Sequence, residues 1–214
     1  MPELAEVERC RRTLSQHCVG KQIAAQGIRS ELSSSAAPVG ANIGSLFATR
    51  PGKYVWLEMN GEGPCVMFHL GMTGNFYVKG ETDVLHLTSE SKYSVTDAWP
   101  PKATKCLLKM TDDTEIAFIN TRRLGRIRLE IDPWKCATIC KLGFDAYTDL
   151  PPLAEFSQLL RRRKGPIKSV LLDQSFAAGL GNWLADEILY HSVMHPQEAT
   201  ATLSDEQVLS IYTS

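Results

Sequence analysis

The sequence predicts an α+β protein with an N-terminal helix, an antiparallel β-sandwich and an all-helical second half. Apolar residues near the N-terminus recur at the spacing of a helix face. Short runs in which apolar and polar residues alternate then dominate as far as residue 131. From about residue 151 the apolar spacing is helical again. We therefore expect a sandwich domain at 1–131, a linker at 132–150 and a helical domain at 151–214.

The N-terminus combines a helix start with a potential nucleophile. The apolar face of the predicted helix consists of Leu4, Val7, Cys10 and Leu14. Removal of Met1 would expose the secondary amine of Pro2, and a terminal amine with a pKa of roughly 8 is partly unprotonated at neutral pH. Attack of this amine on a sugar carbon would give an iminium, and Glu3 supplies an adjacent carboxylate. Because Pro-Glu also begins an ordinary helix well, this feature needs support from distant residues.

The alternating runs predict antiparallel strands. They cover residues 53–59, 64–70, 104–110, 115–119 and 126–131. Asn60-Gly61 and Asp112-Asp113-Thr114 separate neighbouring runs in the way that hairpin connections do. We expect a long surface loop between residues 80 and 101, and a flexible loop at 33–37.

The second half predicts a series of short helices. They are expected at 153–160, at 167–172, at 180–191 and from Ser204 onward. Ser204 begins the last of them, with Glu206 in a capping context. The turn before residue 182 contains two glycines, which permit close approach of a ligand to the backbone. A helix N-terminus at such a turn suits phosphate, so Gly181-Asn182 is a candidate phosphate site.

The composition indicates a globular chain that can bury a sizeable core, since 43% of its 214 residues are apolar and its net charge is −1. No stretch reaches the roughly 18 apolar residues that a membrane span requires, so we expect no membrane partner. The acidic opening lacks the basic and then apolar pattern of a signal peptide, which indicates the interior of a cell.

The six cysteines are scattered, and only Cys136 and Cys140 lie close together. Structural zinc usually needs four ligands in two close pairs. We therefore interpret the cysteines as reduced thiols that mostly pack, and we expect neither a metal nor another cofactor.

Two basic clusters stand out against the nearly neutral net charge. They consist of Arg122, Arg123, Arg126 and Arg128, and of Arg161, Arg162, Arg163 and Lys164. Either cluster taken singly is ordinarily a solvated surface. Two clusters beside glycine-rich turns add weight to a nucleic-acid interface.

Four separated motifs together resemble the formamidopyrimidine-DNA glycosylase family. They are MPELAEVE at 1–8, HLGMTG at 69–74, RRLG at 122–125, and the segment from Asp173-Gln174 through GLGNWLADE at 179–187. The resemblance implies a bifunctional enzyme of base excision repair that flips an oxidised purine, such as 8-oxoguanine or a formamidopyrimidine, out of duplex DNA. Such an enzyme removes the base and cleaves the abasic site by β-elimination. Residues 1–131 would then be the catalytic domain, and 151–214 a helix-two-turn-helix domain.

The resemblance also implies roles for single residues. Pro2 would form a Schiff base with C1′, Glu3 would act as general acid and base, and Lys53 would assist β-elimination and contact phosphate. The expected DNA contacts in the first half are His69 to phosphate or sugar, Met72 as a wedge in the duplex, Arg122 at the orphaned cytosine, its neighbour Arg123, and Leu124 in the gap left by the flipped base. In the second half they are Arg163, Lys168 and Asn182 along the DNA backbone.

Several departures from the family pattern carry expectations of their own. Leu124 stands where the family often has an aromatic residue, so we expect weaker discrimination of the opposite base. Other segments look closer to the plant and fungal branch without zinc. Family members continue with a lesion-capping loop and a finger, so we expect a truncated chain with an incomplete helical module. In that case Val208 and Ile211 would have less to pack against.

Two alternatives to a DNA glycosylase remain open at this stage. A catalytically impaired paralogue or splice form that binds damaged DNA would keep the fold and the basic clusters. An RNA-binding module would share the helical element but would not require Pro2 and Glu3. We expect a monomer that acts on damaged double-stranded DNA in the nucleus, with the cytosol or an organelle as other compartments. The preferred lesion does not follow from the sequence.

Overall fold

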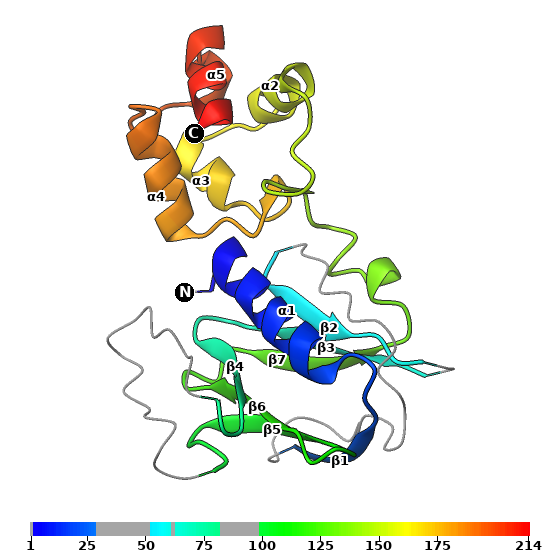
Figure 1. Ribbon diagram of the computed structural model, residues 1–214. Helices are drawn as coiled ribbons and strands as arrows, with labels where there is room; N and C mark the ends of the chain where they lie inside the picture. The colour runs from blue at the N-terminus through cyan, green and yellow to red at the C-terminus, as the bar shows by residue number, and fades with distance from the viewer. Residues whose placement is uncertain (1, 29–51, 61–62, 82–98) are drawn as a thin grey trace. The chain divides into compact units, whose positions relative to one another are not determined.

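The computed structural model describes residues 2–28, 52–60, 63–81 and 99–214 (Figure 1). The chain divides into two compact units. Unit 1 comprises residues 1–49 and 54–133, and unit 2 comprises residues 50–53 and 134–214. The loop expected at 33–37, and most of the one expected between 80 and 101, lie outside the described residues.

Helix α1 of unit 1 spans Leu4–Cys18 and buries the face that the sequence predicts. Its N-cap is Glu3, whose backbone N–H donates to the Glu6 carboxylate at 2.9 Å. This bond satisfies one of the donors that the first helical turn leaves without an intrahelical partner. The Cys10 thiol donates to the Asn75 side-chain oxygen at 3.3 Å. This bond connects the buried face of α1 to strand β4 (Gly74–Val78).

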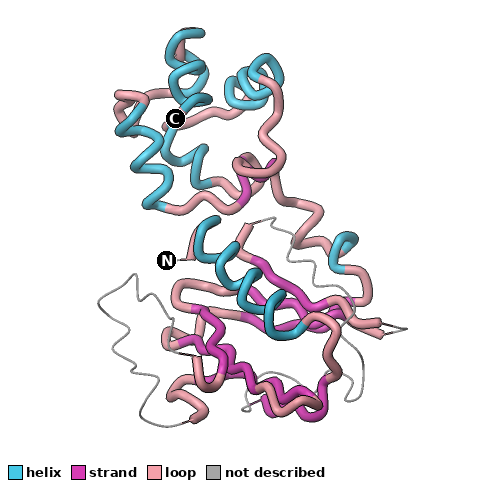
Figure 2. Tube along the Cα trace, in the orientation of Figure 1, coloured by secondary structure: helices cyan, strands magenta, loops and turns pink. Residues whose placement is uncertain are grey.

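Unit 1 contains two antiparallel sheets. The first has the order β1-β5-β6-β4, and the second has the order β2-β3-β7. The strands are β1 (Ile23–Ile28), β2 (Tyr54–Leu57), β3 (Cys65–His69), β4 (Gly74–Val78), β5 (Thr104–Met110), β6 (Glu115–Asn120) and β7 (Arg126–Glu130). Figure 2 shows these strands and α1 in one body. The predicted mixed α+β architecture is confirmed for this half of the chain.

The core of unit 1 is formed jointly by α1 and both sheets. Phe68 of β3 meets Phe76 of β4 and Phe118 of β6, with ring centroids 5.0 and 5.2 Å apart. Phe76 and Phe118 are themselves 5.0 Å apart. These tilted and edge-on contacts join one sheet to the other, because Phe68 belongs to the three-stranded sheet and the other rings to the four-stranded sheet.

Two strands of unit 1 escaped the sequence analysis. In β4, Phe76, Tyr77 and Val78 are all buried, so the strand has none of the alternation that reveals a half-exposed strand. Strand β1 has the sequence IAAQGI, whose small residues give a weak pattern. Its place comes from pairing with β5, where Gly27 is opposite Leu107. Tertiary pairing rather than local preference therefore specifies both strands.

Unit 2 is mainly helical, as predicted. Its helices are α2 (Leu153–Arg161), α3 (Ile167–Leu172), α4 (Asn182–His191) and α5 (Asp205–Thr213), with a short 3-10 turn η2 at Thr200–Thr202. The segment 132–150, expected as a linker, contains a 3-10 turn η1 (Pro133–Lys135) and strand β8 (Phe144–Asp145). Strand β8 pairs in parallel with β9 (Ala177–Ala178), which ties most of this segment into unit 2.

Helix α5 corrects two expectations. Its capping box joins Ser204 to Gln207, with the Ser204 hydroxyl accepting from Gln207 N at 3.2 Å, so Gln207 rather than Glu206 completes the cap. Val208 and Ile211 are buried, with 1% and 5% of their surfaces exposed. Both side chains are therefore packed within unit 2. Part of that packing comes from Tyr212, whose ring lies 5.3 Å from Phe156 of α2.

Within the described ranges, every helix is too short or too polar to serve as a membrane span. The longest is α1, with 15 residues.

The end of α4 contains a strained residue that yields a stability prediction. Val193 has a φ of 55°, in the left-handed region, while Met194 N donates back to Leu189 O at 2.9 Å. Glycine is the usual residue at this position of a helix end, because a β-branched side chain is strained there. Val193 is 89% exposed, so its side chain contributes little packing. We expect Val193→Gly to raise the free energy of unfolding by about 1 kcal/mol.

Chemical denaturation of the whole chain measures this effect, and Val19→Gly is the matched control. Val19 also follows a helix and is 40% exposed, but its φ of −60° suits any residue. The control should therefore be neutral or destabilising. Equal effects of the two substitutions would show that backbone strain at Val193 is not the cause.

Candidate functional site

The two residues predicted to carry the chemistry lie at the start of α1. Pro2 is buried, and Glu3 is 2% exposed. A carboxylate is rarely buried to this degree unless it has a partner or a function, because removing it from water is costly. The helix dipole places partial positive charge at this end of α1, which disfavours a protonated amine on Pro2.

Two turns of unit 1 lie against each other. The first, residues 70–74, joins β3 to β4, and the second, residues 121–125, joins β6 to β7. Gly71 of the first turn has a φ of +60°, and a Cβ atom there would lie 2.6 Å from the carbonyl carbon of Leu124. No side chain fits at that distance, so the contact between the two turns requires glycine.

Asn120 holds the two turns together. It ends β6 and is 1% exposed. Its side-chain N–H donates to Leu70 O at 3.1 Å, and its side-chain oxygen accepts from Leu124 N at 3.1 Å and from the Thr73 hydroxyl at 3.5 Å. One buried amide thus satisfies backbone groups of both turns, a role that the sequence analysis missed. Its only sequence signal is a polar residue at the end of an apolar strand.

The predicted DNA contacts of unit 1 lie on or beside these turns. Met72 is 36% exposed and Leu124 is 53% exposed, so both apolar side chains are accessible on turns that lie against each other. Arg122 belongs to the second turn and contacts the first. Its guanidinium lies 3.6 Å from the Met72 sulfur, and its backbone N–H donates to Thr73 Oγ1 at 3.2 Å. Arg123 is exposed and has a φ of 57°.

His69 ends β3 immediately before the first turn. Its Nδ1 accepts from Gly71 N at 3.2 Å, so in the neutral ring the proton is on Nε2. The ring centroid lies 4.7 Å from that of Tyr54. Nε2 is therefore the nitrogen of His69 that can donate to an anionic ligand.

Lys53 groups with unit 2, although it directly precedes β2 of unit 1. Beside it, Gly52 has a φ of +73°, and a Cβ atom there would be 3.7 Å from the Gln174 side-chain oxygen. Gln174 also donates to Leu180 O at 2.9 Å and accepts from Gly179 N at 2.9 Å. The Gln174 side chain therefore lies next to the Lys53 turn and shapes the glycine turn that begins α4.

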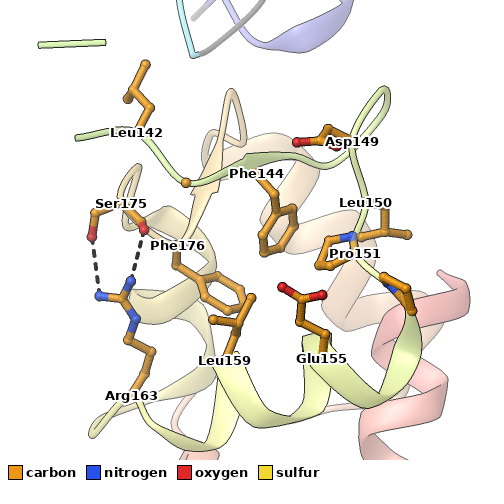
Figure 3. Close-up of a pocket in the computed structure, with 12 residues that line it drawn as sticks. Leu142, Phe144, Asp149, Leu150, Pro151, Glu155, Leu159, Arg163, Ser175 and Phe176 are labelled. Carbon is orange, nitrogen blue, oxygen red and sulfur yellow. Dashed lines mark hydrogen bonds between the residues drawn. The ribbon is translucent and has the colours of Figure 1, made fainter. Parts of the chain in front are cut away.

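Arg163 and Asp173 form an ion pair in unit 2. The Arg163 guanidinium lies 3.0 Å from the Asp173 carboxylate. It also donates to Ser175 O at 2.9 Å (Figure 3). Burial acts to raise the pKa of Asp173, but hydrogen bonds from Ser175 and the charge of Arg163 outweigh it, so the pKa lies below its ordinary value of 3.8. These contacts hold the guanidinium in a defined position, because several of its donors are used.

The other predicted contacts of unit 2 lie on α3 and α4. Lys168 of α3 pairs with Asp186 of α4 at 2.6 Å, so its positive charge is partly compensated. Asn182 is the exposed first residue of α4 and follows Gly181, an N-cap without a side chain. The partial positive charge of a helix N-terminus lies at this position.

Figure 3 shows an open pocket of unit 2 beside Arg163. The side chains of Phe144, Phe176 and Leu159 form much of its wall, and Asp149 and Glu155 lie at its edge. Two carboxylates at the edge repel phosphate. The pocket is therefore a poor place for the DNA backbone. In the described part of the chain, His, Cys, Asp and Glu side chains form no group of three that could hold a metal ion.

The fold defines a class of protein with a two-sheet N-terminal unit and a small helical second unit. The family model described as the formamidopyrimidine-DNA glycosylase N-terminal domain matches residues 1–127. The one described as the formamidopyrimidine-DNA glycosylase H2TH domain matches residues 142–214. The chain belongs to the formamidopyrimidine-DNA glycosylase family.

Individual relatives agree with this assignment. A formamidopyrimidine-DNA glycosylase of Arabidopsis thaliana is 36% identical over all of this chain and 56% of that protein. One from Listeria innocua is 30% identical over 99% of this chain and 74% of that protein. The chain thus spans about half of the plant relative and about three quarters of the bacterial one.

Solved structures show the same fold. The MutM (Fpg) protein of Thermus thermophilus has a TM-score of 0.77 and 27% identity, over 99% of this chain and 72% of that one. The Lactococcus lactis formamidopyrimidine-DNA glycosylase, solved non-covalently bound to AP-site-containing DNA, has a TM-score of 0.77 and 25% identity. That match covers 99% of this chain and 77% of the other.

The role of Asn120 predicts a large effect of its removal. Asn120→Ala should lower the free energy of unfolding of unit 1 by about 1–3 kcal/mol, because Leu70 O and Leu124 N lose a buried partner. Urea denaturation measures the loss, and amide hydrogen exchange should show faster exchange at Leu124. Asn60→Ala, at an exposed turn position, is the control and should change neither measurement. An unchanged exchange rate at Leu124 would contradict the bridging role.

The Asp173 ion pair predicts a pH-dependent contribution to stability. Because the folded-state pKa is depressed, the contribution is present above the unfolded value of 3.8 and is lost as the pH falls through the folded pKa. Asp173→Asn should therefore be less stable than wild type at pH about 7, by less than about 1 kcal/mol because the pair is partly exposed. The difference should shrink as the pH falls below 3.8 and through the lower folded-state pKa. Urea midpoints across this range test it, and a constant difference would refute the assignment.

Proposed function

We propose that this chain is a bifunctional DNA glycosylase and AP lyase of base excision repair, acting on oxidised purines through Pro2. The observation that carries the proposal is the buried Glu3 at the N-cap of α1, directly after Pro2, in a chain of this family. The names of the relatives and the DNA in the Lactococcus lactis structure support DNA as the partner.

The nucleophile in this proposal is the secondary amine that Pro2 gains when Met1 is removed. Its lone pair attacks C1′ of the damaged nucleotide, and the bond to the base breaks, so that the base leaves with the electron pair and takes up a proton. The Pro2 nitrogen loses its proton and the C1′–O4′ bond then breaks, which gives an iminium between that nitrogen and C1′. Burial and the positive end of the α1 dipole both disfavour the protonated amine, which keeps the lone pair available. The pyrrolidine ring holds the nitrogen in one direction relative to α1.

Glu3 is the proton carrier. As an acid it protonates the sugar oxygen when the ring opens, and as a base it removes a proton from C2′ for β-elimination. Once Glu3 has given its proton to O4′ it is a carboxylate again, so it can accept the C2′ proton while the C3′–O bond to the phosphate breaks. Lys53 would assist elimination and contact phosphate from its glycine turn, where Gly52 lies against Gln174.

The two turns of unit 1 would open the duplex. Met72 and Leu124 are apolar and exposed, as a wedge between bases requires, and Arg122 presents a planar donor group to an orphaned base. Asn120 keeps both turns rigid, so the wedge does not collapse when it meets stacked bases. His69, Arg123, Arg163, Lys168 and Asn182 would contact sugar and phosphate. Such an enzyme would act in the nucleus or in an organelle that contains DNA.

The proposal predicts a covalent complex with abasic DNA. Protein whose Met1 removal is verified by mass, incubated with an abasic-site duplex and borohydride, should yield a trapped band because borohydride reduces the iminium. N-acetylation should abolish the band by blocking the amine. Pro2→Gly retains an amine but loses the ring, so trapping should slow on the order of 100-fold.

Binding of the same duplex is measured in parallel, and it should be similar for all three proteins. Binding without trapping by the unblocked protein would sink the lyase proposal and support a noncatalytic DNA-binding protein. A trapped band that survives N-acetylation would place the nucleophile elsewhere, for example on Lys53.

A further inference from the structure

The six cysteines of the chain, all within the described residues, fall into two groups. Cys10, Cys18 and Cys106 are buried, with at most 2% of their surfaces exposed. Burial raises the pKa of Cys10 and of Cys18 to about 12, and it also raises the pKa of the half-buried Cys65. A thiol that stays protonated reacts slowly with oxidants, so these cysteines serve packing.

The remaining two cysteines are more accessible and share one turn. Cys140 is exposed and Cys136 is half-buried, and both belong to the segment that follows the end of unit 1 at Pro133. Cys140 N donates to Cys136 O at 3.0 Å, which is the hydrogen bond of a single α-helical turn. The Cys140 thiol points back along the chain and donates to Trp134 O at 3.2 Å. The side chain of Cys140 therefore lies beside the backbone of η1, which directly precedes Cys136 in the chain.

This geometry suits a bond between the two sulfurs. Residues four apart in an α-helical turn have Cα atoms about 6 Å apart, which is within the range of natural disulfides. Their Cβ atoms are about 5–6 Å apart, so the turn must close by roughly 1 Å. The turn lies between η1 and β8 and is not part of a longer helix, so closing it disturbs few other hydrogen bonds.

We propose that Cys136 and Cys140 are a peroxide-responsive pair that forms a reversible disulfide. The Cys140 sulfur attacks one oxygen of hydrogen peroxide, the O–O bond breaks, and a sulfenic acid and water result. The Cys136 sulfur then attacks the Cys140 sulfur, an S–S bond forms, and the sulfenic oxygen leaves as a second water. In total, two thiols lose two hydrogens and one peroxide is reduced to two waters. A thiol such as glutathione reverses the reaction, because an exposed disulfide is readily attacked.

The flanking lysines make the test direct. Trypsin cleaves after Lys135 and Lys141, which releases a six-residue peptide, 136–141, that contains both cysteines and no other. Native full-length protein is treated with hydrogen peroxide, and its remaining thiols are blocked with N-ethylmaleimide. The protein is then digested, and the masses of its peptides are measured by mass spectrometry. Peptide 136–141 should carry no N-ethylmaleimide, and its mass should be about 2 Da below that of the unblocked dithiol peptide. Glutathione added before blocking should restore two thiols that react with N-ethylmaleimide. Peptides with Cys10, Cys18 and Cys106 should be blocked as free thiols once the protein is unfolded.

Cys136→Ser is the matched control, since it keeps the exposed thiol and removes its partner. In this variant Cys140 should stop at the sulfenic acid, heavier by about 16 Da, or proceed to higher oxides. Gain of two or three oxygens by the wild-type peptide, at the rate seen in Cys136→Ser, would overturn the proposal. So would a disulfide between two chains, or one that forms only in denaturant.

Discussion

The buried amide of Asn120 is the interaction on which the candidate interface of unit 1 depends. A carboxamide has donors on one side and an acceptor on the other, so one side chain can satisfy a carbonyl of one turn and an N–H of the next. Both groups would otherwise be buried without a partner, which costs more than the bond itself contributes. Gly71 completes the arrangement, because only glycine lets the backbones approach so closely. Met72 and Leu124 remain exposed because the backbone beneath them is held from within.

Unit 2 depends on a comparable polar side chain. Gln174 uses its amide to shape the turn before α4, and the same side chain lies beside Gly52. Lys53 and the N-terminus of α4 are far apart in sequence, yet their turns contact one residue of unit 2. Gln174 thus lies against the turns that carry two candidate phosphate contacts, Lys53 and Asn182.

Two of the basic side chains of unit 2 are paired with carboxylates, so their positive charge is partly compensated. Arg163 and Lys168 each have a carboxylate partner, Asp173 and Asp186. A phosphate that approaches them must compete with these carboxylates, so each contact would add less affinity than a free cation would. In exchange the side chains are ordered before binding, which lowers the entropic cost of recognition. The ion pairs of Arg163 and Lys168 would therefore order these two side chains as well as lower their attraction for phosphate.

The amino-acid order by itself determined the helices of both units and most strands, and it indicated Pro2 and Glu3 as candidates for the chemistry, because periodicity and residue type are local properties. It also determined the family, since four separated motifs occur together. Only the tertiary structure decided that Phe76, Tyr77 and Val78 form a strand buried on both faces, because such a run has no period. Only the tertiary structure gave Asn120 its role, since a long-range hydrogen bond leaves no trace in the local sequence.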